Sequence, residues 1–201
     1  MRPIRVQCTL SFANPETMNV LLSMARAIDR ANEGIGRAVS WLAVIMVLIG
    51  AYNAIVRYLG RYIGFNLSSN AYIEMQWYLF SLLFLLGAAW TLKQDAHVRV
   101  DVFYARVSDR ARSWINVVGS VLFLIPFCVF VLWVSWPAVR NSWQVREVSP
   151  DPGGLVRWPL KAVILVAFML LLLQALSELV KEIDRLRQRA PRAAESHGEG
   201  V

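Results

Sequence analysis

Charged side chains are missing from long stretches of this 201-residue chain. Residues 38–56, 75–92, 113–139 and 162–177 contain no Asp, Glu, Lys or Arg, although the chain has 21 Lys+Arg and 14 Asp+Glu in total. Soluble domains mix charged and apolar residues at helical or strand period, so this separation excludes an ordinary soluble globular protein. Hydrophobic residues make up 57% of the chain, which excludes a disordered basic tail.

Histidine and cysteine are also scarce, with two of each: His97, His197, Cys8 and Cys128. None of the charge-free stretches contains a histidine, which excludes a haem held between facing membrane helices. The two cysteines form no CxxC pair and predict neither a metal site nor a disulfide framework. No glycine-rich phosphate loop and no nucleophile beside a histidine is found. The sequence therefore predicts no cofactor and no enzyme.

The lengths of the charge-free stretches fit membrane-spanning helices. A helix rises about 1.5 Å per residue, so about 20 apolar residues cross a hydrocarbon layer of about 30 Å. The predicted fold is an all-α integral membrane protein with four transmembrane helices plus amphipathic interfacial helices. The expected spans are 37–58, 72–92, 114–136 and 158–179. The remaining segments are a cytoplasmic tail with an amphipathic helix (1–35), a cytoplasmic loop with an interfacial helix (93–112), a periplasmic loop (137–157) and a cytoplasmic tail (180–201).

The net charge of +7 is distributed unevenly between the two sides of such a protein. Segments 1–37, 93–112 and 180–192 would share one side and hold 15 basic residues, against six on the opposite side. The positive-inside rule then places both termini in the cytoplasm. The basic charge is explained by topology and by attraction to membrane lipids, and no nucleic-acid partner is predicted.

Two further features follow from helical spacing. Leu21, Met24, Ile28, Ala31 and Ile35 recur on one face, which predicts an amphipathic helix on the cytoplasmic leaflet before the first span. Pro126, near the middle of the third span, removes a backbone donor and is expected to kink that helix.

Glu74 lies at the outer end of the second predicted span, 72–92. An acid inside a membrane suggests a proton or cation site. Its position in the first turn of the second span instead favours an interfacial carboxylate paired with a basic residue, and Arg57 ends the first span on the same side. We favour a structural pair or a subunit contact over ion transport.

Small and polar residues mark helix faces that allow close approach in lipid. The candidates for subunit interfaces are Gly50, Asn53, Ala54, Arg57, Glu74, Ser81, Gly87 and Ala88. In the loop after the second span, His97, Arg99 and Asp101 alternate. They are candidates for a cytoplasmic-surface anchor or a clamp on a partner, although on physical grounds alone a solvated turn leading into the surface helix is the favoured interpretation.

The order of several short motifs resembles one known family. Arg57-Tyr58 closes the first span and Glu74 opens the second, followed by 84–89 (FLLGAA) and 97–101 (HVRVD). Further along the chain, the matching residues are Glu147, Ser149, Gly154-Leu155 and Trp158-Pro159. Over residues 30–185 the chain resembles the small permease subunit, called the DctQ type, of tripartite ATP-independent periplasmic (TRAP) transporters. Val156-Arg157 departs from the proline that is common there in the family.

The resemblance implies a non-catalytic subunit of the bacterial inner membrane. It would act as a scaffold for a large multispan permease, which takes up an organic acid with sodium after a periplasmic receptor delivers it. Arg140, Arg146 and Glu147 are then candidates for receptor docking. The alternative is an autonomous homo-oligomeric small transporter or channel built around Glu74, against which the absence of ionisable residues at the span centres argues.

Overall fold

The computed structural model describes residues 15–64, 69–94 and 107–195, which form helices joined by loops. In these ranges the only β-type pairing is one isolated antiparallel bridge, between Val148 and Val156. Four helical stretches are long and apolar enough to cross a membrane, which confirms the predicted all-helical protein with four such helices. They are Glu16–Ile63, Asn70–Lys93, Arg110–Gln144 and Trp158–Gln188.

Helix α1 (Pro15–Ile63) is one continuous helix of 49 residues. At about 1.5 Å per residue it is about 74 Å long, more than twice the thickness of the hydrocarbon layer. It contains both the predicted amphipathic helix and the predicted first span 37–58, without a break at Gly34 or Gly36. The membrane boundary within this helix stays a prediction.

Helix α2 (Asn70–Lys93) begins where the Ser69 hydroxyl accepts a hydrogen bond from the Ala71 N–H at 3.3 Å. Helix α4 (Asp109–Gly119) begins in the same way, with Ser108 accepting from the Ala111 N–H at 3.4 Å. Both serines satisfy a backbone donor that has no partner within its own helix. The last helix, α6, runs over Trp158–Glu195.

Proline 126 lies just after a wider turn of the third apolar helix. Helix α4 passes directly into a π-helical turn, η1 (Ser120–Leu124), and then into α5 (Ile125–Gln144). The Ile125 N–H donates to the carbonyl of Ser120, five residues earlier. A proline ring collides with the carbonyl four residues before it in a regular helix, so the wider turn explains how the helix continues through Pro126.

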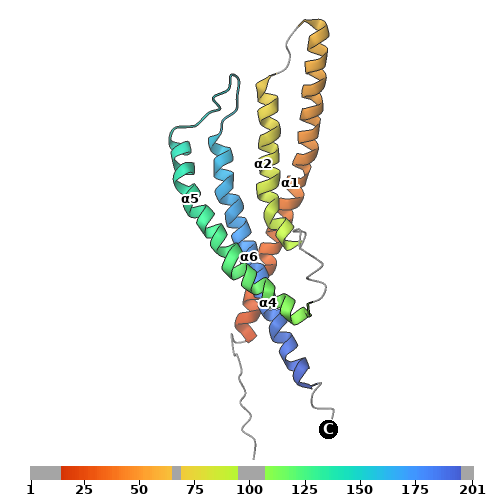
Figure 1. Ribbon diagram of the computed structural model, residues 1–201, viewed down its shortest axis with the longest axis vertical. Coiled ribbons are helices and arrows are strands. Elements are labelled where there is room, and N and C mark those ends of the chain that lie inside the picture. Colours follow the sequence, from red (N-terminus) through yellow and green to blue (C-terminus); the bar gives the residue numbers. More distant parts are fainter. Residues whose placement is uncertain (1–14, 65–68, 95–106, 196–201) are drawn as a thin grey trace, which may run out of the picture.

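The helices form two antiparallel pairs. Figure 1 shows α1 beside α2 and α5 beside α6, and the two pairs spread apart toward one end of the molecule. That end carries the end of α1, the start of α2 and the connection 145–157, and we call it the loop end. The start of α1 and the end of α6 lie toward the opposite end, the terminal end, where α1, α4 and α6 cross. Helix α6 is central, because α1, α2, α4 and α5 all pack against it.

The interior of this bundle is made of small and polar side chains. Ala25, Ala89, Cys128, Ala167 and Ala175 are buried, whereas large apolar side chains cover the surface of all four helical stretches. In water, such an arrangement would leave most of the hydrophobic surface exposed. In lipid it is the expected one, because small residues allow helices to approach closely and apolar side chains face the acyl chains.

Candidate functional site

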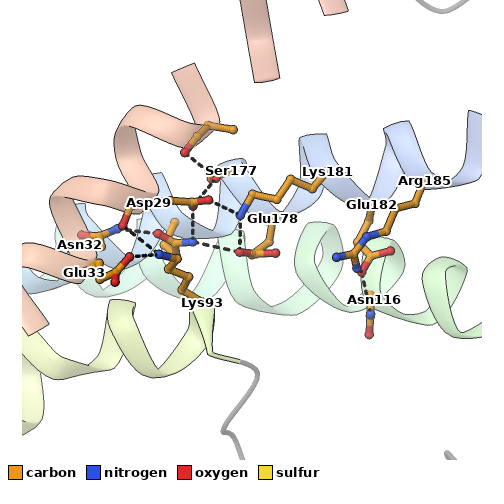
Figure 2. Close-up of polar contacts among 12 residues, drawn as sticks. Asp29, Asn32, Glu33, Lys93, Asn116, Ser177, Glu178, Lys181, Glu182 and Arg185 are labelled. Atoms are coloured by element: carbon orange, nitrogen blue, oxygen red, sulfur yellow. Dashed lines mark hydrogen bonds and ion pairs between the residues drawn. The ribbon is translucent and has the colours of Figure 1, made fainter. Parts of the chain in front are cut away.

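A group of polar side chains joins three helices toward the terminal end (Figure 2). Helix α6 contributes residues at i, i+3, i+4 and i+7, which share one face of a helix, and α1 contributes residues at i, i+3 and i+4. The last residue of α2 completes the group. We call this group the polar cluster, and its members are Asp29, Asn32, Glu33, Lys93, Gln174, Ser177, Glu178 and Lys181.

Gln174 is fully buried at the centre of the polar cluster. Its Nε2 lies 2.9 Å from Asp29 Oδ1 and 3.0 Å from Glu178 Oε1. Its Oε1 accepts a hydrogen bond from Asn32 Nδ2 at 2.7 Å. The amide therefore uses both donors and an acceptor, as a buried polar group requires.

Two lysines balance the carboxylates of the polar cluster. Lys181 Nζ lies 2.7 Å from Asp29 Oδ2 and 2.8 Å from Glu178 Oε1. Lys93 Nζ lies 2.6 Å from Glu33 Oε2. Charges removed from water need partners of this kind. These ion pairs fix α1 against α6 and against the end of α2.

The sequence prediction missed the polar cluster. It recognised the apolar face of residues 21–35 but assigned no partner to the polar face, which holds Asp29 and Glu33. In the structure Asp29 and Glu33 of that face contact α6 and α2, while Leu21 and Met24 remain 40% and 57% exposed. The signal available was the spacing of Gln174, Ser177, Glu178 and Lys181 along one helix face, at the end of the charge-free stretch 162–177 and just after it.

A second buried group lies toward the loop end and is centred on Glu74, which is 2% exposed. Its Oε1 accepts a hydrogen bond from the Ser149 hydroxyl. Its Oε2 accepts one from the Leu155 N–H at 2.5 Å. The Arg157 guanidinium lies 3.8 Å from Oε1. We call these four residues the loop anchor, because they attach the 145–157 loop to α2.

Glu74 was predicted to pair with Arg57, and that prediction is wrong. The ion-pair partner is Arg157 from the loop before α6, while the Arg57 side chain is exposed on α1. Glu74, Trp77 and Tyr78 share one face of α2. The Arg157 guanidinium lies 5.7 Å from the centre of the Trp77 ring, and the Tyr78 hydroxyl donates to the Leu155 carbonyl at 3.4 Å.

The 145–157 loop folds back on itself. The Ser149 N–H donates to the Leu155 carbonyl at 3.0 Å, and the Arg157 N–H donates to the Glu147 carbonyl at 2.9 Å. Gly153 takes a φ of +72°, which glycine adopts without steric cost. A Cβ on Gly154 would lie 2.6 Å from Ser149 Oγ and 2.9 Å from Glu74 Oε2. The contact of the loop with Glu74 therefore needs a glycine at this position.

The charged candidates for receptor docking differ in their surroundings. Arg140 is exposed. The Arg146 guanidinium lies 4.8 Å from the centre of the Trp158 ring and 5.7 Å from that of Trp143. Glu147 accepts a hydrogen bond from Lys161 at 2.5 Å, and this ammonium holds the pKa of the carboxyl below its ordinary value. Arg146 and Glu147 thus make contacts within the chain.

The candidates for subunit interfaces differ in how closely they pack against other parts of this chain. Gly50 and Asn53 face into the chain, because a Cβ on Gly50 would collide with the Gln76 amide of α2 and Asn53 is buried. Ala54 is exposed on α1. On α2, Gly87 has open space around its Cβ position. Ser81, whose hydroxyl donates to the Trp77 carbonyl at 2.7 Å, and Ala88 are half-buried.

The residues His97, Arg99 and Asp101, predicted to anchor the cytoplasmic surface, lie outside the described residues. So does most of the predicted interfacial helix in 93–112, of which α4 covers the last part from Asp109. Their role stays a prediction.

The chemistry of both buried groups is that of structural pairing. Asp29, Glu33, Glu74, Glu147, Glu178 and Glu182 each lie within 4 Å of a lysine or arginine nitrogen. Within residues 15–64, 69–94 and 107–195, no three His, Cys, Asp or Glu side chains are grouped so as to hold a metal ion. These carboxylates hold helices and a loop together.

Comparison with known proteins identifies the family. The model of the DctQ component of tripartite ATP-independent periplasmic transporters matches residues 46–185. Neither the curated proteins nor the solved structures gave a match. The matched residues are more than half of the chain and include α2, η1 and α5, the 145–157 loop and most of α6. The chain therefore belongs to the DctQ family and is the small, non-catalytic membrane subunit of a TRAP transporter.

Proposed function

We propose that this subunit braces the large multispan permease of its transporter in the bacterial inner membrane. The permease would take up an organic acid with sodium after a periplasmic receptor delivers it. Membership of the TRAP family implies both partners, the permease and the periplasmic binding protein. The observation that carries the bracing role is the internal pairing of the buried charges, which suits a fixed scaffold better than a transport path.

We also propose that the terminal end faces the cytoplasm and the loop end the periplasm. The four spanning helices place the start of α1 and the end of α6 on the same side (Figure 1). The positive-inside rule assigns that side to the cytoplasm, since 15 of the 21 basic residues belong to it. The 145–157 loop is then available to the receptor, and the polar cluster lies near the cytoplasmic surface.

An autonomous channel around Glu74 has less support. Such a channel needs the carboxylate to line a path between subunits. Glu74 is instead buried within its own chain and bound by Ser149, Leu155 and Arg157. This engagement supports the accessory role.

Affinity purification tests the proposal. The tagged chain is purified from its native membrane in mild detergent, and the proteins that accompany it are identified by mass spectrometry. Recovery of a larger multispan permease in equal amounts is expected. Recovery of this chain alone as a stable homo-oligomer, together with transport by that oligomer in liposomes, would contradict the proposal.

Two variants on α2 test where the permease binds. Gly87→Leu and Ala88→Leu are expected to weaken recovery of the permease without preventing membrane insertion, because small residues permit close helix contact in lipid. Gly87→Leu is the clearer test, since its Cβ position is open in this chain. Gly34→Leu is the matched control, because Gly34 is also open and lies on α1. Unchanged recovery with both α2 variants would exclude this face.

A further inference from the structure

We infer that Glu74 is a positioning residue that holds the 145–157 loop in the conformation that the receptor recognises. This inference rests on the proposed function, because it assigns the loop to receptor docking. The inferred role of the buried Glu74 carboxylate is therefore neither ion binding nor contact with the permease.

The first argument is the geometry of the loop anchor. The two carboxylate oxygens of Glu74 bind different parts of the loop, the Ser149 hydroxyl at one side and the Leu155 N–H at the other. Ser149 Oγ also accepts a hydrogen bond from Arg157 Nη2 at 3.2 Å. One buried side chain on a helix therefore joins both arms of the loop, and charge-assisted hydrogen bonds of this kind are stronger than neutral ones.

The second argument is the close packing of the loop backbone at Gly154 against the Glu74 carboxylate. A Cβ on Gly154 would lie within 2.9 Å of both Ser149 Oγ and Glu74 Oε2. The close approach of the loop backbone to this carboxylate thus depends on a residue without a side chain. Removal of the carboxylate would leave the half-buried Leu155 N–H and Ser149 hydroxyl without this acceptor, which is costly.

The third argument concerns what the loop presents. Val148 and Val156 form the antiparallel bridge, so their side chains lie on the same face of the loop. They are 55% and 44% exposed. The Glu147 carboxylate, in contrast, is bound by Lys161. The loop therefore offers the receptor an apolar pair in a fixed position, and Glu74 binds Ser149 and Leu155, the residues next to the two valines.

The test uses the transporter assembled with its permease in proteoliposomes, with its periplasmic receptor added outside. Uptake is measured as a function of receptor concentration for the native chain, Glu74→Gln, Gly154→Ala and the control Glu178→Gln. Gly154→Ala disturbs the same contact without changing a charge. Glu178→Gln makes the same chemical change in the polar cluster at the other end of the molecule.

A direct readout of the loop accompanies the uptake measurement. A nitroxide label is attached to Val148→Cys in a chain with Cys8→Ser and Cys128→Ala, and its mobility is recorded by electron paramagnetic resonance. In Glu74→Gln and Gly154→Ala, we expect a more mobile label. The receptor concentration for half-maximal uptake should rise about tenfold, as when the recognised conformation falls to about a tenth of the population. The maximal rate and the recovery of the permease should not change.

Each other outcome overturns a distinct statement. An unchanged label mobility in both variants would show that Glu74 does not hold the loop. A mobile label with an unchanged uptake curve would show that the receptor does not recognise the loop conformation. The proposal that the subunit braces the permease would not be affected. A loss of permease recovery with Glu74→Gln but not with Glu178→Gln would assign Glu74 to assembly instead. If the native chain supports no uptake with any permease, the proposed function itself fails.

Discussion

Replacing Gly36 by alanine adds one methyl group between α1 and α2. A Cβ at this position would lie 2.5 Å from Cγ and 2.7 Å from Cβ of Trp90. Because Trp90 Cβ is attached directly to the backbone of α2, rotation of the indole ring cannot relieve the collision, and the two helices must separate locally. Gly34, two residues earlier in the same helix, has no atom within 4 Å of its Cβ position and is the matched control.

The expected magnitude follows from these distances. Overpacking of a tight contact costs about 1–3 kcal/mol, whereas glycine to alanine in an open helix position stabilises by up to about 1 kcal/mol. Gly36→Ala should therefore be less stable than Gly34→Ala by about 1–4 kcal/mol. For a chain of this size, that difference corresponds to a melting temperature about 2–16 °C lower.

The assay is thermal unfolding of each purified variant in the same detergent at the same scan rate. Adding Trp90→Ala to Gly36→Ala should recover only part of the loss, because the contact with the Cβ remains. Equal melting temperatures for Gly36→Ala and Gly34→Ala would refute the close packing of α1 on α2 at this point.

Two further predictions concern Gln174 of the polar cluster and Glu147 of the 145–157 loop. Gln174→Leu removes the buried acceptor of the Asn32 amide and one of the donors to Asp29, which keeps Ser177 and Lys181. It should lower the free energy of unfolding by about 1–3 kcal/mol, whereas Gln188→Leu, at an exposed position of the same helix, should change the melting temperature little. The lowered pKa of Glu147 predicts a stabilisation that is complete above the ordinary glutamate pKa of 4.5 and is lost as the pH falls through the lowered value. Melting temperatures measured from pH 7 to pH 3 should therefore fall less in Glu147→Gln than in the native chain, and parallel curves would contradict this assignment.

The four apolar helices could be predicted from the sequence because lipid imposes a simple condition. A span must exclude charge over about 20 residues, and that condition can be read along the chain without knowledge of the fold. The length of α1 could not be read in this way. The charged residues before Ala38 indicate where a membrane would end, but they do not interrupt a helix.

The partners of the buried charges depend on contacts between distant segments. Glu74 and Leu155 are 81 residues apart, and the position of Leu155 depends on how α6 packs against α2. Arg57 lies nearer in sequence, yet its side chain is exposed on α1. Sequence spacing therefore located the acidic residue at a helix start, while its partner followed only from the tertiary structure.

The contact of Gln174 with Asp29 also has a consequence for how the protein is made. The two residues are 145 positions apart, so at about 5–20 residues per second the ribosome finishes the partner about 7–30 s after the carboxylate. During this interval α1 has been synthesised without the α6 residues that pair with its polar side chains, whereas Lys93 of α2, the partner of Glu33, already exists. The charges that α6 engages are therefore made at the beginning of synthesis, and the last helix supplies their partners only at the end.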